Sequence, residues 1–219
     1  MSSTYSSVLF ENENFIAVDK KSGVLSVPSR MGKQDPRPVL GLELQEDLKK
    51  QIYPVHRLDF EVSGIVIFAL NSSAHKWANT AFESRQVHKT YHALSEKKSA
   101  QEFSAFKNSQ NWQSLLVRGK KRAFEAPYGQ EALTVAKILG ENEKSWLWQL
   151  NPLTGRSHQL RVEMAKQGFP ILGDTLYGSK IAYDLSSIAL RAVVVDFKQL
   201  TDFKKWSLPE HLETSSFLA

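Results

Sequence analysis

The chain has 219 residues, of which 42% are hydrophobic and 23% are charged, and it contains no cysteine. These values are typical of a folded globular protein, and the length suits one large domain or two small ones. The lack of cysteine excludes disulfides, thiolate metal sites and a cysteine nucleophile. The formal net charge of +5 favours an anionic partner, of which nucleic acid is the usual one.

The sequence contains neither a membrane-spanning segment nor a secretory signal. No run reaches the roughly 18 apolar residues of a transmembrane helix, and the N-terminus lacks the basic and apolar segments of a secretory signal. We therefore expect a cytoplasmic protein with no membrane partner. Residues 1–7 are small and polar and are predicted to be loose. No repeat or long linker interrupts the chain, which predicts a single domain over residues 1–219.

Short apolar stretches bounded by turn residues predict strands along the whole chain. In chain order these are residues 8–10, 15–18, 24–27, 64–70, 87–94, 115–117, 132–139, 145–150 and 188–197. The stretch 64–70, GIVIFAL, is wholly apolar and is predicted to be a buried, central strand. Residues 29–38 are basic and contain Pro and Gly, which predicts a loop.

Three segments have helical character. Leucines at every fourth position predict an amphipathic helix over 39–50. Asn71 or one of the serines after it can cap a helix over 73–84, and a helix over 157–167 would end at Gly168. Because strands outnumber helices and do not alternate regularly with them, the sequence predicts an α+β fold with a largely antiparallel sheet.

The first segment that could carry chemistry is residues 53–64, YPVHRLDFEVSG, which leads into the predicted central strand. A loop that feeds a central strand is a rigid place to mount a reactive group. Asp59 is the candidate nucleophile or base, with His56 and Arg57 as local cations. The same residues would also suit a strand-entry turn with a local salt bridge.

The second segment is residues 151–164, NPLTGRSHQLRVEM. Arg156 is predicted to lie at the start of a helix, with His158 and Arg161 in its first turns. Cations at that end oppose the helix dipole, so a carboxylate or a phosphate should compensate them. The alternative is that both arginines are solvated and His158 is packed.

Two further segments combine cations with other signals. Residues 118–122, RGKKR, place four cations at a predicted hairpin, where they could contact phosphates. Lys89 and Tyr91 lie in HKTYH, which offers an aromatic ring among cations for stacking on a base. A solvated turn and a core tyrosine are the respective alternatives. A Walker loop, GxGxxG, GxSxG and HExxH are absent, which disfavours nucleotide-driven enzymes, dinucleotide oxidoreductases and zincins.

Together these segments resemble the RluA-type pseudouridine synthases over roughly residues 8–212. The matched stretches are HRLD followed by SG, VHKTYHA, GRSHQLR, GFPILGDTLYG, the opening VLFENENFIAVDKKSGVLSVP and the closing SLP. HRLD and GRxHQxR in this order, about a hundred residues apart, form a specific signal. The chain departs from the family pattern at Lys21, Val62 and Arg191, where proline, threonine and histidine are usual.

The resemblance implies an enzyme that converts uridine to pseudouridine in RNA without a cofactor or a metal. It also implies a mixed, mostly antiparallel sheet in two halves around a central catalytic cleft. We expect the partner to be a stem-loop of tRNA or ribosomal RNA, read by its shape, and the protein to be a monomer. The small S4-like N-terminal domain of some relatives is not expected, since the entry strand begins near residue 8.

The same resemblance assigns roles to individual residues. Asp59 carries the chemistry, and Arg156 pairs with it and keeps it ionised. Tyr91 stacks on the target uracil, and Arg57 fills the space that the uracil leaves on flipping out of its stack. His56 supports the loop, and His158 lies in a matched motif. Lys89 and Arg161 are candidate phosphate contacts within matched motifs, and the 118–122 hairpin is a further candidate outside them.

Two other functions remain compatible with these residues. A non-catalytic RNA-binding or RNA-chaperone protein on the same scaffold would bind RNA in a salt-dependent manner and form no product. A glycosidase that used the same aspartate would release free uracil.

Overall fold

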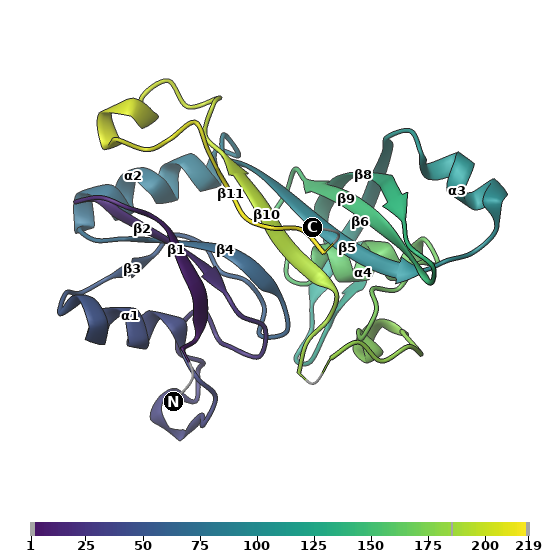
Figure 1. The fold of residues 1–219 in the computed structure, drawn as a ribbon, viewed down its shortest axis with the longest axis horizontal. Helices are drawn as coiled ribbons and strands as arrows, with labels where there is room; N and C mark the ends of the chain where they lie inside the picture. The colour runs from purple at the N-terminus through teal and green to yellow at the C-terminus, as the bar shows by residue number, and fades with distance from the viewer. Residues whose placement is uncertain (1–2, 185, 218–219) are drawn as a thin grey trace. The chain divides into compact units, whose positions relative to one another are not determined.

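The computed structural model describes residues 3–184 and 186–217. They divide into two compact units, the first made of residues 3–87, 186–187 and 192–215, and the second of residues 88–184, 188–191 and 216–217. Most of the first unit therefore precedes the second in sequence, and the chain returns to the first unit near its end (Figure 1).

The first unit is built on a sheet whose strands follow the order β1-β2-β4-β10. β3 pairs with β4, and β11 pairs with β10. The strands are β1 (Tyr5–Glu11), β2 (Phe15–Lys20), β3 (Tyr53–Pro54), β4 (Ser63–Ala69), β10 (Leu190–Asp196) and β11 (His211–Glu213). The helices are α1 (Leu40–Leu48), α2 (Ser72–Glu83) and the short 3-10 turns η1 (Gly32–Gln34) and η3 (Phe203–Trp206).

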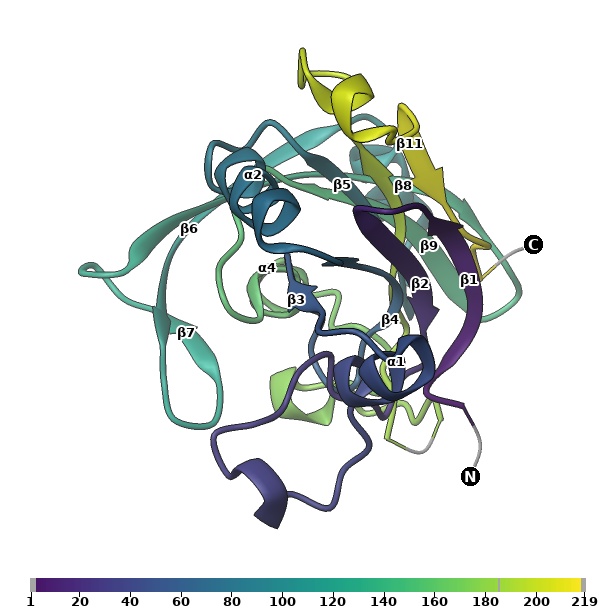
Figure 2. The same ribbon diagram turned by 90° about the vertical axis from the view of Figure 1, so that its left-hand side faces the viewer.

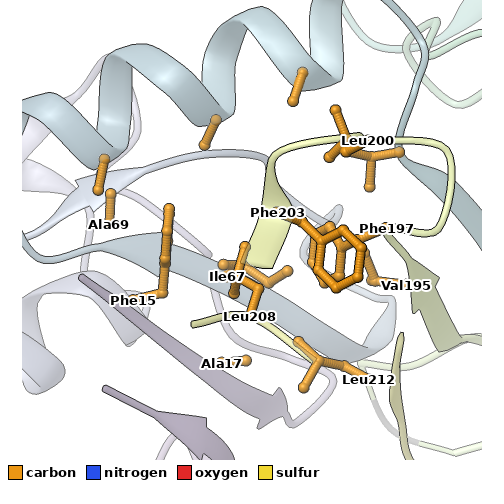
Figure 3. Packing of buried hydrophobic residues seen from close by; sticks show 14 of the residues in the cluster. Phe15, Ala17, Ile67, Ala69, Val195, Phe197, Leu200, Phe203, Leu208 and Leu212 are labelled. Atoms are coloured by element: carbon orange, nitrogen blue, oxygen red, sulfur yellow. The ribbon is translucent and has the colours of Figure 1, made fainter. Parts of the chain in front are cut away.

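One face of this sheet packs against α2. The helix presents Ala74, Ala78 and Ala81 to a buried cluster that includes Ile67 of β4 and Val195 of β10 (Figure 3). Small alanines at helical spacing let the helix lie close to the sheet. The central strand β4 is therefore fixed on this side by apolar contacts.

The opposite face of β4 packs against α1. Side chains alternate along a strand, so Phe68 points away from the Ile67 face. A methyl group placed on Gly41 of α1 would lie 3.4 Å from the Phe68 ring, and Leu40 and Leu44 of the same helix are buried. Both faces of β4 are covered, which explains why its sequence is uninterruptedly apolar.

The second unit is built on an antiparallel sheet in the order β5-β9-β8-β6-β7. Its strands are β5 (His88–Glu96), β6 (Gln110–Arg118), β7 (Ala123–Glu125), β8 (Gln130–Glu141) and β9 (Ser145–Pro152). Its helices are α3 (Ala100–Phe106), α4 (Gln159–Lys166) and the 3-10 turn η2 (Thr175–Tyr177). Figure 2 shows the hairpin formed by β6 and β7.

Aromatic side chains fill the core of the second unit. Phe106 of α3 packs edge-on against Trp112 and Trp148, with ring centroids 6.3 and 5.3 Å apart. Phe169 lies 5.0 Å from Trp148, whose indole N–H donates to Ser95 Oγ at 2.8 Å. The buried indole is thus both packed and hydrogen-bonded, as a buried tryptophan requires.

The structure confirms the predicted α+β fold with its mostly antiparallel sheet. It corrects three local expectations. Tyr5–Ser7 belong to β1 rather than to a loose terminus, and residues 1–2 lie outside the described part of the chain. Residues 24–27 form only an isolated bridge between Leu25 and Val39. The helix α3 was not predicted.

In the part of the chain that the structure describes, no helix has both the length and the apolar character needed to cross a membrane.

Candidate active site

The loop between β3 and β4, residues 55–62, carries three of the predicted site residues and is called the Asp59 loop below. Leu58 and Val62 are buried, with 7% and 2% of their surface exposed, whereas Arg57 is exposed and Asp59 is partly exposed. Apolar anchors on either side of Asp59 therefore hold the loop down while its carboxylate stays accessible.

Backbone hydrogen bonds fix the same loop on both sides of Asp59. Ser26 Oγ lies 3.0 Å from both the N–H and the carbonyl oxygen of Leu58, accepting from one and donating to the other. The Gly23 N–H donates to Phe60 O at 2.9 Å, and the Val62 N–H donates to Asp59 O at 3.2 Å. These bonds fix the backbone on both sides of the Asp59 carboxylate.

His56 is a supporting residue of this loop. Its Nε2 accepts a hydrogen bond from the Ile67 N–H at 3.2 Å, and its ring stacks on Phe82 at 5.0 Å between centroids. Because Nε2 is the acceptor, the proton of the neutral ring lies on Nδ1. These contacts agree with a role in holding the loop against β4.

In the second unit, Gln159 organises the loop that carries Arg156. Its Oε1 accepts from Arg156 N at 3.0 Å and from Thr154 Oγ1 at 2.7 Å, and its Nε2 donates to Leu133 O at 2.9 Å. Gln159 is buried, with 4% of its surface exposed, and its hydrogen bonds join the Arg156 loop to β8. Sequence reasoning did not give Gln159 a role, although it lies inside the GRSHQLR stretch.

The prediction that Arg156 lies at the start of a helix is wrong. α4 begins at Gln159, and His158 before it has a φ of 52°, so Arg156 lies in the preceding loop. Its Nε donates to Glu131 O at 2.8 Å. The expected conflict with the helix dipole is thereby avoided, because the guanidinium belongs to the loop rather than to the helix.

Arg161 forms a buried ion pair, which corrects the expectation of a phosphate contact. Its Nε and Nη2 donate to the two carboxylate oxygens of Asp174 at 2.7 and 2.8 Å. The side chains are 2% and 1% exposed. A bidentate, buried pair of this kind leaves no accessible charge for RNA, and it ties α4 to the GDTLYG segment.

His158 is held by Tyr177 of the same segment. Its Nδ1 lies 2.9 Å from Tyr177 Oη, which also accepts from the Ala123 N–H at 2.9 Å. The tyrosine therefore connects the loop before α4 to β7. This contact makes His158, which is partly exposed, part of a network that supports the loop.

Lys89 and Tyr91 lie on β5, next to the start of the Arg156 loop. Tyr91 pairs with Leu150 in the β5–β9 ladder, and Asn151 Nδ2 donates to Lys89 O at 3.3 Å and to Thr90 Oγ1 at 2.8 Å. Burial lowers the pKa of Lys89. Asn151, at the end of β9, thus joins the VHKTYHA stretch to the strand that leads into the Arg156 loop.

The predicted basic hairpin is also present, at residues 118–122 between β6 and β7. All four of its cationic side chains are exposed: Arg118, Lys120, Lys121 and Arg122. An open cleft of about 530 Å³ adjoins it, lined by residues of β7, α4 and η2. The lining includes neither Tyr91 nor Arg156, but it contains residues 175–178 of the matched GFPILGDTLYG stretch.

The first unit carries His56, Arg57 and Asp59 on one loop. The second unit carries Lys89 and Tyr91 on β5, and Arg156, His158 and Arg161 in the loop before α4 and in α4 itself. Among the described residues, no three His, Asp or Glu side chains gather as metal ligands would.

Comparison with known proteins points to one family. The profile of the RNA pseudouridylate synthase family matches residues 14–166. The dual-specificity RNA pseudouridine synthase RluA of Vibrio vulnificus is 32% identical over 198 residues, covering 88% of this chain and 78% of that protein. The tRNA pseudouridine synthase C of the same organism is 30% identical, covering 78% and 73%.

A solved structure shows the same fold. Human RNA pseudouridylate synthase domain containing 1 superposes with a TM-score of 0.68 at 23% identity, covering 90% of this chain and 80% of that one.

Proposed function

The chain belongs to the RNA pseudouridylate synthase family and is an isomerase acting on RNA, and on this premise we propose that Asp59 is its essential catalytic carboxylate. One observation carries the proposal: Asp59 is partly exposed at the turn of a loop whose neighbours Leu58, Phe60 and Val62 are all hydrogen-bonded. A reactive group needs this combination of accessibility and fixed position.

The proposed reaction converts a uridine of RNA into pseudouridine. The C1′–N1 bond breaks, the uracil turns within the site, and C5 bonds to C1′. C5 gives up its hydrogen as a proton and N1 gains one, so the reaction consumes no second substrate. A carboxylate can serve by attacking C1′, by attacking C6 or by removing a sugar proton, and each route ends in the same loss of hydrogen from C5.

The other matched residues complete the proposal. Arg156 is assigned as the cation that keeps Asp59 ionised, since an opposite charge stabilises a carboxylate. Its backbone is already fixed by Gln159. Tyr91 is assigned to stack on the uracil, and Arg57, which is exposed, to fill the space left by the flipped base.

The substrate we propose is a stem-loop of tRNA or ribosomal RNA, read by its shape. The relatives' names support this class, because one is called dual-specific and another acts on tRNA. The exposed cations of the 118–122 hairpin are proposed to contact phosphates. We expect a monomer in the cytoplasm, where both RNAs are found.

The test is tritium release from RNA labelled at C5 of uracil, with tRNA and ribosomal RNA assayed separately. We expect release by the wild type and a loss of about 10³-fold or more in Asp59→Asn, because amide replacement removes the charge and keeps the shape. Glu61→Gln is the matched control, since Glu61 is a second carboxylate of the same loop, and it should retain turnover.

Other outcomes would contradict the proposal in different ways. Wild-type turnover in Asp59→Asn would exclude the assigned carboxylate. Release of free uracil would identify a glycosidase. Salt-dependent binding of both RNA pools without tritium release would support a non-catalytic RNA-binding protein.

A further inference from the structure

The open cleft of about 530 Å³ in the second unit has an apolar lining that solvent reaches. Two of its large apolar side chains are partly open to solvent: Phe124 of β7 is 40% exposed, and Leu176 of η2 is 36% exposed. Val162 and Ala165 of α4 add to the apolar lining. The volume lies in the range of sites that bind small organic groups. The cleft therefore has room for a nucleobase against the Phe124 ring.

One wall of this cleft is rigid. Tyr177 lines it, and its hydroxyl accepts from the Ala123 N–H at 2.9 Å and donates to Ala123 O at 3.1 Å. The guanidinium of the buried Arg161 lies 5.3 Å from the centre of the Tyr177 ring. Ring and hydroxyl are both fixed before a ligand binds, which lowers the entropic cost of binding.

Positive charge dominates the 118–122 hairpin and the cleft lining taken together. Arg122 belongs to both, and Lys166 of α4 also lines the cleft. Glu125 is the one acidic residue among them, and its carboxylate forms an ion pair with Lys166 at 2.7 Å. The four hairpin cations are exposed beside the cleft. This balance suits a polyanion that places an apolar ring in the cleft and its charge on the hairpin.

The cleft is joined to the Arg156 loop. Tyr177 Oη lies 2.9 Å from Nδ1 of His158, and His158 follows Arg156 by two residues in the same loop. RNA that is engaged by this loop therefore passes close to the cleft. The nucleotide that reaches the cleft must be near the target uridine in the RNA chain.

An exposed aromatic ring among cations is the surface on which proteins stack unpaired bases. We propose that the cleft binds the base of an unpaired nucleotide other than the target uridine, stacked on Phe124, with its phosphate on Arg122. The cleft is then a specificity site, because it favours RNA loops that can extrude a second base near the target. This inference rests on the proposed function and names a feature of its substrate. Stacking accepts every base, so the cleft selects an unpaired position rather than a base sequence.

The first test compares Phe124→Leu, Phe124→Tyr and Leu176→Ala with Tyr128→Leu. Phe124→Leu keeps an apolar side chain without a ring, and Phe124→Tyr keeps the ring. Tyr128 is the matched control because it is an aromatic residue on the turn after β7, is 77% exposed and does not line the cleft. The Kd for tRNA and for ribosomal RNA is measured between about 50 and 200 mM salt in the Asp59→Asn background. Tritium release gives kcat and KM, and Tm reports the fold.

We expect Phe124→Leu to raise Kd and KM about tenfold, the usual effect of losing one aromatic–base stack. The kcat at saturating RNA should not change, because the base is stacked equally in the ground state and the transition state. The slope of log K against log salt should also stay the same, since no charge is removed. Phe124→Tyr and Tyr128→Leu should match the wild type. Leu176→Ala should lose less affinity than Phe124→Leu, and it decides if Phe124→Leu lowers Tm.

An experiment on the RNA identifies the bound nucleotide. The shortest stem-loop that retains binding is prepared with an abasic residue at each loop position other than the target. With the wild type, one abasic position should weaken binding about tenfold. With Phe124→Leu the same abasic position should cause no further loss, because the stack is already absent. Equal losses with both proteins at every position would overturn the inference.

The proposed function and this inference fail in different ways. Wild-type affinity in Phe124→Leu and Leu176→Ala, together with normal tritium release, refutes this inference alone. Weaker binding by Phe124→Leu, with no tritium release by the wild type, refutes the proposed function and leaves a cleft that binds RNA. An equal loss of affinity in Tyr128→Leu would mean that exposed aromatic residues contact RNA in general, which overturns the cleft as a distinct site.

Discussion

At the scale of single residues, Glu163 on α4 is a buried carboxyl with an incomplete set of partners. Thr134 Oγ1 donates to its Oε2, while its Oε1 has no hydrogen-bond partner among the described residues. Burial, the largest cause, raises the pKa of Glu163 to about 7 from its usual 4.5. The folded protein therefore binds this proton more tightly than the unfolded chain does.

This shift predicts how stability depends on pH. Because the pKa of Glu163 is raised in the folded protein, its stabilising contribution to the free energy of unfolding is complete below about pH 4.5. This contribution is lost as the pH rises through 7. Glu163→Gln cannot ionise, so its stability relative to the wild type should increase between pH 4.5 and 8, by at most about 3 kcal/mol. Urea unfolding at several pH values measures the difference.

The control for this experiment is Glu143, an exposed glutamate on the turn between β8 and β9. Glu143→Gln should show a constant offset from the wild type over the same range. A pH-independent offset for Glu163→Gln as well would mean that Glu163 ionises normally in the folded state.

At the scale of elements, the junction between the Asp59 loop and β4 depends on a glycine. Gly64 has a φ of 110°, and a Cβ there would lie 2.2 Å from the Ala192 carbonyl oxygen and 2.6 Å from the Ala192 nitrogen of β10. Both observations exclude a side chain without movement of the backbone. The close approach of β10 to β4 therefore fixes where the loop must end.

Gly64→Ala is accordingly expected to lower the free energy of unfolding by about 3 kcal/mol or more, because β10 must move or φ must change. Gly140→Ala in β8 is the matched control, since a Cβ there meets nothing within 4 Å. It should stay within about 0.5 kcal/mol of the wild type. Equal denaturation midpoints for the two variants would contradict the close approach.

Local sequence signals predicted those elements whose determinants lie within a few residues. Asn71 was expected as a cap, and its side chain accepts from Ala74 N at 2.9 Å at the start of α2. α3 begins with an equally local signal, a capping box between Ser99 and Glu102. β3 and β11 are too short to give a pattern, and only their partners β4 and β10 make them strands.

The residues of the candidate site also divide into those that a local sequence signal predicts and those whose role depends on distant partners. The motif around Asp59 is contiguous and could be found from the sequence, but Ser26 holds Leu58 across 32 residues and leaves no local trace. Arg161 is cationic in the sequence, and only the structure shows that Asp174 takes up its charge. Roles that depend on burial or on distant partners could not be deduced from spacing.

At the scale of the whole molecule, the excess positive charge is unevenly distributed. The formal net charge is +5, and the 118–122 hairpin alone holds four exposed cations. Neutralising them would leave a net charge of +1. If RNA affinity follows local charge, this hairpin should matter far more than other lysines; if it follows net charge, any four cations should be equivalent.

We therefore predict that changing Arg118, Lys120, Lys121 and Arg122 together to Gln weakens RNA binding and reduces the slope of log K against log salt by about 3 at most. The Kd is measured between 50 and 200 mM salt in the inactive Asp59→Asn background, so that turnover does not interfere.

The control variant changes four other lysines to Gln and reaches the same net charge. These lysines are all exposed and all lie in the first unit: Lys49, Lys50, Lys204 and Lys205. In the active background the hairpin variant should raise KM while kcat at saturating RNA stays unchanged, because its cations lie outside the matched catalytic motifs. Equal losses of affinity in the two variants would show that net charge governs binding and that the hairpin has no special role.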